Sequence, residues 1–144
     1  ASDREQGDVG GCVIGLGLQG RAALAEGDGE RAVTLLREAL PDAEGIDSLA
    51  PLILARLARA ELVAGDRGTA QERARACLAR IAEGGTVSTK DGPEIYYSLY
   101  LVLEDDALRE QARTRLVERA SAVRNDTYRE HLLKRAWPAP ELGT

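Results

Sequence analysis

The sequence predicts an all-α protein built from antiparallel helix-turn-helix units. Residues 22–39 and 60–77 each contain an apolar helical run, a Gly-Asp pair and a second helical run. Ala32 and Ala70 correspond, so the two copies are offset by 70 − 32 = 38 residues. A repeat of this length is typical of stacked helical hairpins. Aromatic residues make up only 3% of the chain, without Phe or Met, so the core must consist of Ala, Leu and Val, which suits closely packed helices.

Apolar residues at helical spacing, bounded by glycine and proline, define each expected element. We expect a loop from Pro41 to Asp47, with Ser48 as the N-cap of the next helix and Pro51 tolerated in its first turn. The longest loop is expected at 84–93, and the prolines from Pro138 onward should end the last helix. The expected helices are 9–26, 30–40, 48–64, 68–82, 94–104, 107–123 and 127–136.

These elements divide the chain into three parts. Residues 1–8 are polar and form an expected linker, 9–126 form three helical hairpins, and 127–144 form a C-terminal capping helix and tail. The chain starts at Ala1 and contains no Met, so we expect it to be a processed piece of a longer polypeptide.

The residues inside the hairpins resemble the tetratricopeptide repeat family, whose unit is about 34 residues long. Large residues fill the groove between neighbouring helices, and small ones let paired helices approach. The matching residues are Leu16, Gly20, Ala32, Leu36 and Ala39 in repeat one; Leu54, Leu57, Ala58, Gly65, Ala70, Ala74 and Cys77 in repeat two; and Tyr96, Leu99, Ala112 and Leu116 in repeat three. The resemblance implies hairpins stacked in a right-handed superhelix, an α-solenoid. The chain also resembles the helical-repeat segments of large bacterial regulatory proteins.

The resemblance implies a concave groove lined by the first helix of each hairpin. The groove-facing positions carry over to Ile14, Gly17, Arg21, Leu24, Ala25, Leu52, Ala55, Arg59, Leu62, Val63, Glu94, Tyr97, Leu101, Glu104 and Asp105. From these we choose Arg21 and Arg59 as polar anchors, and an apolar floor of Leu24, Leu62, Tyr97 and Leu101, as the partner-binding residues. Two guanidinium groups at matching positions suit a carboxylate or an acidic peptide. In the alternative, both arginines pair with Glu61, Glu26 or another local acid.

A competing motif predicts an enzyme. Gly15-x-Gly17-x-x-Gly20 is a dinucleotide fingerprint, and Glu38 lies 38 − 20 = 18 residues further on, near the position of a ribose-binding acid. An NAD(P)-binding dehydrogenase fragment is therefore the alternative function. Against it, the first strand would span only residues 12–14, and nothing after residue 46 supplies further strands of a doubly wound sheet.

The composition also argues against several classes of function. The net charge of −5 argues against nucleic acid binding, and no apolar run approaches the roughly 20 residues of a membrane helix. Cys12 and Cys77, with the single His131, cannot complete a zinc site, and His131 is expected to face solvent. We therefore expect a cytoplasmic scaffold or sensor segment, with no catalytic residue, metal or cofactor. It should bind a protein or peptide, an acidic one by preference, and self-association stays open.

Overall fold

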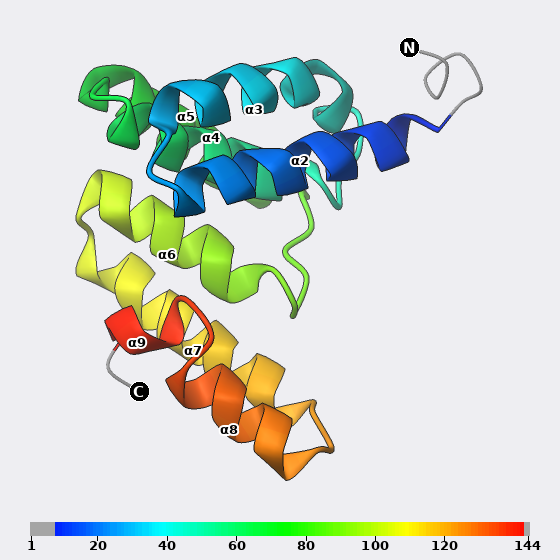
Figure 1. The fold of residues 1–144 in the computed structure, drawn as a ribbon, viewed down its shortest axis with the longest axis vertical. Coiled ribbons are helices and arrows are strands. Elements are labelled where there is room, and N and C mark those ends of the chain that lie inside the picture. Colours follow the sequence, from blue (N-terminus) through cyan, green and yellow to red (C-terminus); the bar gives the residue numbers. More distant parts are fainter. Residues whose placement is uncertain (1–7, 143–144) are drawn as a thin grey trace.

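The computed structural model describes residues 8–142, and all regular secondary structure within them is helical (Figure 1). The all-α class is thereby confirmed, and no strand occurs between residues 8 and 142. The expected linker lies outside the described residues except for Asp8, which caps the first helix. The helices are α2 (Val9–Ala25), α3 (Gly29–Ala43), α4 (Ala50–Val63), α5 (Arg67–Ala82), α6 (Gly92–Leu103), α7 (Asp106–Ser121), α8 (Asp126–Lys134) and α9 (Ala139–Leu142).

The helices pack in consecutive pairs. Helix α2 packs against α3, α4 against α5, and α6 against α7, each pair being joined by a short turn. Helix α4 is central because it also contacts α2, α3 and α6. In Figure 1, α2–α5 form one end of the molecule, α7 and α8 form the other, and α6 lies between them. The short helix α9 folds back onto α7 and α8.

The Gly-Asp pairs build the turns within the hairpins. Gly27 and Gly65 adopt left-handed φ angles of 77° and 93° after α2 and α4. The following aspartates, Asp28 and Asp66, are the N-caps of α3 and α5 and accept hydrogen bonds from backbone amides at 3.1 Å and 3.2 Å. The third hairpin lacks this glycine, so Glu104 itself adopts a φ of 57°. A side chain in this region costs roughly 1–2 kcal/mol, which glycine avoids.

Small residues lie at the closest helix contacts, as the sequence predicts. Ala32, Ala70 and Ala112 are all fully buried. A Cβ atom on Gly20 of α2 would lie 2.6 Å from Cγ of Leu36 in α3. Since real Cβ atoms do not approach other atoms so closely, Gly20 is required for the observed distance between α2 and α3.

Two local expectations were wrong. Helix α3 continues through Pro41 to Ala43, because Ala43 is fully buried and its packing outweighs the missing amide of the proline. Leu49, and not Ser48, occupies the N-cap of α4, without a side-chain hydrogen bond. The last expected helix does end before Pro138, at Lys134, and a further short helix, α9, forms beyond it with Pro140 in its first turn, where no amide donor is needed.

Candidate partner-binding groove

A cavity of about 180 Å³ opens between α2, the start of α4 and the loop before α6. We call it the α2–α4 groove. Gly17 lets α2 approach α4 closely at this groove, since a Cβ there would lie 3.0 Å from Cδ1 of Ile53. Ile14 and Leu18, one helical turn apart, remain 51% and 53% exposed. The lining residues are Val13, Ile14, Gly17, Leu18, Arg21, Leu49, Leu52, Ile53, Arg56, Lys90 and Asp91.

A buried ion pair forms the floor next to this groove. Nε and Nη2 of Arg56 donate to the two carboxylate oxygens of Glu94 at 2.7 Å and 2.9 Å. Both residues are over 90% buried, at 4% and 7% exposure. Nε of Arg21 lies 3.9 Å from the same carboxylate, with half of its side chain exposed. This bidentate geometry is the strongest form of a charge-assisted hydrogen bond and connects α4 to α6.

Arg59 completes what we call the arginine cluster, which comprises Arg21, Arg56 and Arg59 around the carboxylate of Glu94. Burial lowers the pKa of Arg59, Glu94 opposes that effect, and the neighbouring charges of Arg21 and Arg56 lower the pKa further. Arg56 and Arg21 contact the Glu94 carboxylate directly, and Arg59 lies close enough for its charge to interact with that of Glu94. The cluster carries excess positive charge although the chain as a whole is acidic.

Next to the arginine cluster, Trp137 from the C-terminal part of the chain covers Arg59 of α4 and Tyr97 of α6. The guanidinium carbon of Arg59 lies 4.4 Å from the centre of the Trp137 ring, a cation–π contact. The Tyr97 ring meets Trp137 edge-on, with 5.4 Å between ring centres and 78° between planes. Desolvation raises the pKa of Tyr97, and Glu141 adds to that effect.

The six partner-binding residues chosen from the sequence therefore do not line one common groove. Arg21 alone lines the α2–α4 groove. Leu24 and Tyr97 are buried at 5% and 6% exposure, so they are not an open apolar floor. Leu62 and Leu101 are partly buried against the core, and the guanidinium of Arg59 lies over the Trp137 ring. Arg21 and Arg59 lie close enough for their charges to interact, since the charge of Arg21 contributes to lowering the pKa of Arg59.

Of the acids in the alternative interpretation, Glu61 pairs with other arginines, whereas Arg21 does meet another local acid, Glu94. Glu61 is 1% exposed and accepts from Arg37 of α3 at 3.2 Å and from Arg73 of α5 at 3.3 Å. It therefore connects three helices and is not the partner of Arg21, whose acid is Glu94. Sequence reasoning placed Glu94 in the groove but missed Arg56. The only signal was their separation, 94 − 56 = 38 residues, which equals the repeat offset.

The glycines of the dinucleotide fingerprint all lie inside α2. Gly17 faces α4 and Gly20 faces α3, while a Cβ on Gly15 would meet no atom within 4 Å. The fingerprint requires a turn between a strand and a helix, which is absent from residues 8–142. Helix packing accounts for two of the three glycines.

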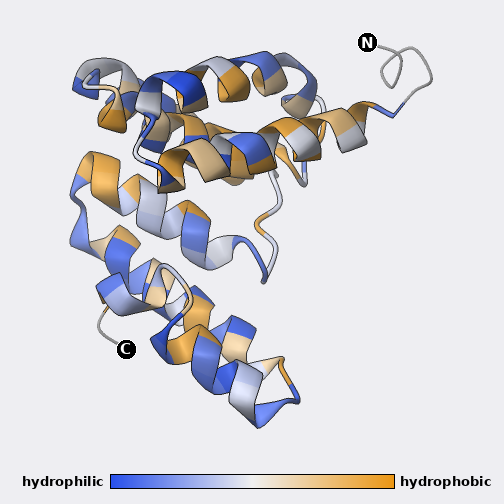
Figure 2. Cartoon of the chain, in the orientation of Figure 1, coloured by the Kyte–Doolittle hydropathy of each residue, from blue (hydrophilic) through white to orange (hydrophobic). Residues whose placement is uncertain are grey.

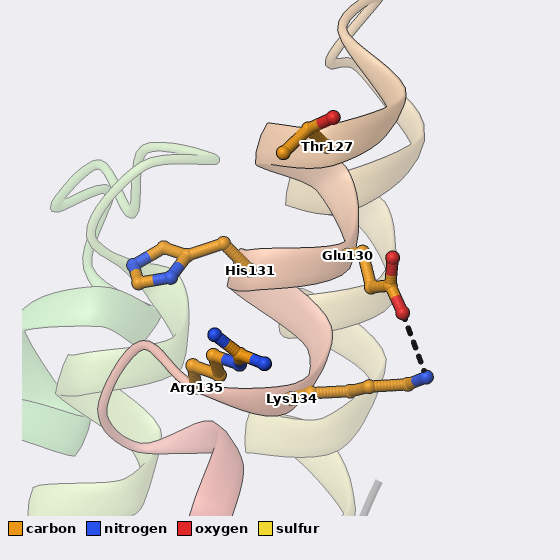
Figure 3. A pocket seen from close by; sticks show the side chains of 5 residues that line it. All are labelled: Thr127, Glu130, His131, Lys134 and Arg135. Atoms are coloured by element: carbon orange, nitrogen blue, oxygen red, sulfur yellow. Dashed lines mark hydrogen bonds and ion pairs between the residues drawn. The ribbon is translucent and has the colours of Figure 1, made fainter.

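A second depression, of about 360 Å³, lies on α8 (Figure 3). Glu130 and Lys134 form an ion pair of 3.0 Å on one side of the helix, and this contact lowers the pKa of Glu130. His131 and Arg135 extend from the other side, so these groups do not converge on one point. His131 is exposed and stacks on Tyr128 with ring centres 6.2 Å apart.

No three His, Cys, Asp or Glu side chains gather as metal ligands within residues 8–142. Among the described helices, none combines the length and apolarity needed to cross a bilayer. Comparisons with protein-family models, curated proteins and solved structures gave no match. The tetratricopeptide resemblance therefore stays a prediction from residue spacing, and the functional argument depends on the α2–α4 groove.

Proposed function

We propose that this chain is a protein-interaction domain of tetratricopeptide type, with its hairpins stacked in a right-handed superhelix. Its α2–α4 groove binds an acidic peptide or protein segment that also carries apolar side chains. The observation that supports this most directly is the pairing of half-exposed Ile14 and Leu18 with the cations Arg21 and Lys90 in one cavity. The biological role that fits is a scaffold or sensor segment within a larger cytoplasmic regulatory protein.

The apolar half of the groove supplies affinity. Ile14 and Leu18 lie on one face of α2, and Figure 2 shows hydrophobic residues along this helix. Fully burying an aliphatic side chain is worth about 1.5–3 kcal/mol, so covering the exposed half of each contributes about 1 kcal/mol. Exposed aliphatic groups next to a cavity are typical of contact surfaces.

The cations supply selectivity. Lys90 has no ion-pair partner among residues 8–142, and Arg21 approaches only a carboxylate that Arg56 already holds by two hydrogen bonds. A carboxylate of the partner therefore meets two cations that are not fully neutralised. Basic partners are repelled by the same charges.

Selection from a displayed random-peptide library on the immobilised chain tests this proposal. We expect the selected peptides to be rich in Asp, Glu, Leu and Ile. Fluorescence anisotropy with one selected peptide should show about 10-fold weaker binding to an Arg21→Gln/Lys90→Glu variant, since a charged hydrogen bond contributes roughly 1.5–3 kcal/mol. The control is Arg75→Glu, an exposed change on α5 outside the groove.

Two results contradict the proposal: selection of neutral or basic peptides, or unchanged affinity in the double variant. Sedimentation of the wild-type chain over a range of concentrations tests the other occupant, a second copy of the chain. A dimer that Leu18→Ser dissociates would assign the groove to self-association.

A further inference from the structure

We propose that Arg59, Tyr97 and Arg113 form a second peptide-binding site, and that the chain's own residues 137–142 occupy it as a detachable ligand. This inference goes beyond the groove described above and does not depend on it. The ligand class is a short segment with an aromatic residue, prolines, an acid and a terminal aliphatic residue. Its members here are Trp137, Pro138, Ala139, Pro140, Glu141 and Leu142.

Both ends of the segment are held by side chains from other helices. Trp137 lies under the guanidinium of Arg59 from α4 and against the Tyr97 ring of α6. At the other end, Nε of Arg113 in α7 donates to the backbone carbonyl of Leu142 at 3.0 Å. Leu142 itself is fully buried. Peptide-binding sites use the same kinds of contact: an aromatic anchor, a buried aliphatic residue and side-chain hydrogen bonds to backbone carbonyls.

Charge also matches the segment to its site. Glu141 lies close enough to Arg59 to raise the pKa of that guanidinium against the effect of burial. Nη2 of Arg109 reaches the carbonyl of Glu141 at 3.4 Å. The arginine cluster has excess positive charge, so an acidic segment is favoured there over a neutral one.

The hydrogen bonding shows why the segment can leave. The backbone amides of Ala139, Glu141 and Leu142 donate only to carbonyls of residues 136 and 138. Within residues 8–142, every long-range hydrogen bond to the segment comes from an arginine side chain. Its release therefore breaks no backbone hydrogen bond of α2–α8. A helix of four residues has little stability of its own, so α9 is held in place by these arginine contacts and by the burial of Ala139 and Leu142 against the core.

Trp137 is the only tryptophan in the chain, which gives a direct assay. A full-length Trp137→Ala variant has no tryptophan and a weakened ligand of its own. We add a synthetic peptide with the sequence of residues 136–144 and record the emission of its tryptophan. We expect a saturable blue shift, because the indole moves from water into the site. Adding Arg59→Gln should weaken binding about 5-fold or more through loss of the cation–π contact, whereas the control Arg75→Gln should not change it.

Absence of a saturable shift at millimolar peptide, or a shift that Arg59→Gln leaves unchanged, overturns the inference. If the Trp137→Ala variant fails to fold, hydrogen exchange in the wild-type chain tests the inference instead. Release predicts that the amides of Ala139 and Leu142 exchange at least 100-fold faster than those of buried α4 residues. Equal protection would identify the segment as a fixed part of the core. Binding of an acidic peptide in the α2–α4 groove is a separate measurement that can succeed when this one fails.

Discussion

Two alanine substitutions in α2 should change stability in opposite directions. In Gly15→Ala, the added Cβ meets no atom within 4 Å. Replacing glycine by alanine inside a helix then stabilises the domain by about 0.5–1 kcal/mol. In Gly20→Ala, the Cβ would lie 2.6 Å from Cγ and 2.8 Å from Cδ2 of Leu36. Leu36 is fully buried, so a shift of its side chain disturbs the surrounding core, and the same gain in helix propensity is opposed by overpacking.

The size of the stability change follows from comparing Gly15→Ala with Gly20→Ala. Overpacking a buried contact costs about 1–3 kcal/mol. Both variants gain the same helix propensity, so their difference in unfolding free energy isolates that cost. Gly20→Ala itself should lose about 0.5–2 kcal/mol. For a chain of this size 1 kcal/mol shifts the melting temperature by about 3 °C, so the two variants should melt roughly 3–9 °C apart.

Urea denaturation followed by circular dichroism measures both free energies. Combining Gly20→Ala with Leu36→Ala completes a double-mutant cycle, and we expect a favourable coupling of about 1 kcal/mol or more because the shortened side chain makes room. If Gly20→Ala were as stable as Gly15→Ala, Gly20 would not lie at the contact between α2 and α3. The packing explanation of the glycine motif would then be wrong.

Three further outcomes follow from buried groups. Ala70→Leu should lower the unfolding free energy by about 1–3 kcal/mol in urea, whereas Ala76→Leu on the exposed side of α5 should not. Burial raises the pKa of Cys77 from 9.0 to about 12. Only the unfolded thiol then ionises above pH 9, so stability should fall by about 1.4 kcal/mol per pH unit from there, a slope that Cys77→Ala reduces. Arg56→Met strips Glu94 of its bidentate partner and should cost about 3–5 kcal/mol by chemical denaturation.

The sequence predicted the helices well because their ends are local. Gly65 and Asp66 illustrate this: a left-handed residue ends α4, and the next side chain caps α5, so two neighbouring residues define both boundaries. Pro41 shows the limit of such rules. Its missing amide predicts a helix end, but the buried Ala43 extends α3 beyond it, and that burial depends on tertiary packing.

The site could be predicted only where one repeat acts alone. Arg21 was assigned to a groove from its position within one repeat, and in the structure it lines the α2–α4 groove. Tyr97 was expected in the same groove, but Trp137, 137 − 97 = 40 residues further along the chain, covers it. The pairing of Arg56 with Glu94 likewise joins two helices. The residue pattern within one repeat does not show which side chains from other segments of the chain pack against that repeat.

The different surroundings of Arg21 and Arg59 predict different losses on substitution. Arg21→Gln removes a half-exposed side chain whose carboxylate contact is 3.9 Å long, and exposed pairs contribute only about 0–1 kcal/mol. Stability and Trp137 emission should stay near wild type while binding of the groove peptide weakens. Arg59→Gln removes the cation 4.4 Å from the Trp137 ring. The emission of Trp137 should therefore move to the red, and the unfolding free energy should fall by about 1–2 kcal/mol. The groove peptide should still bind. Equal loss of peptide binding in both variants, with no change in emission, would restore the expectation that the two arginines are equivalent anchors of a single groove.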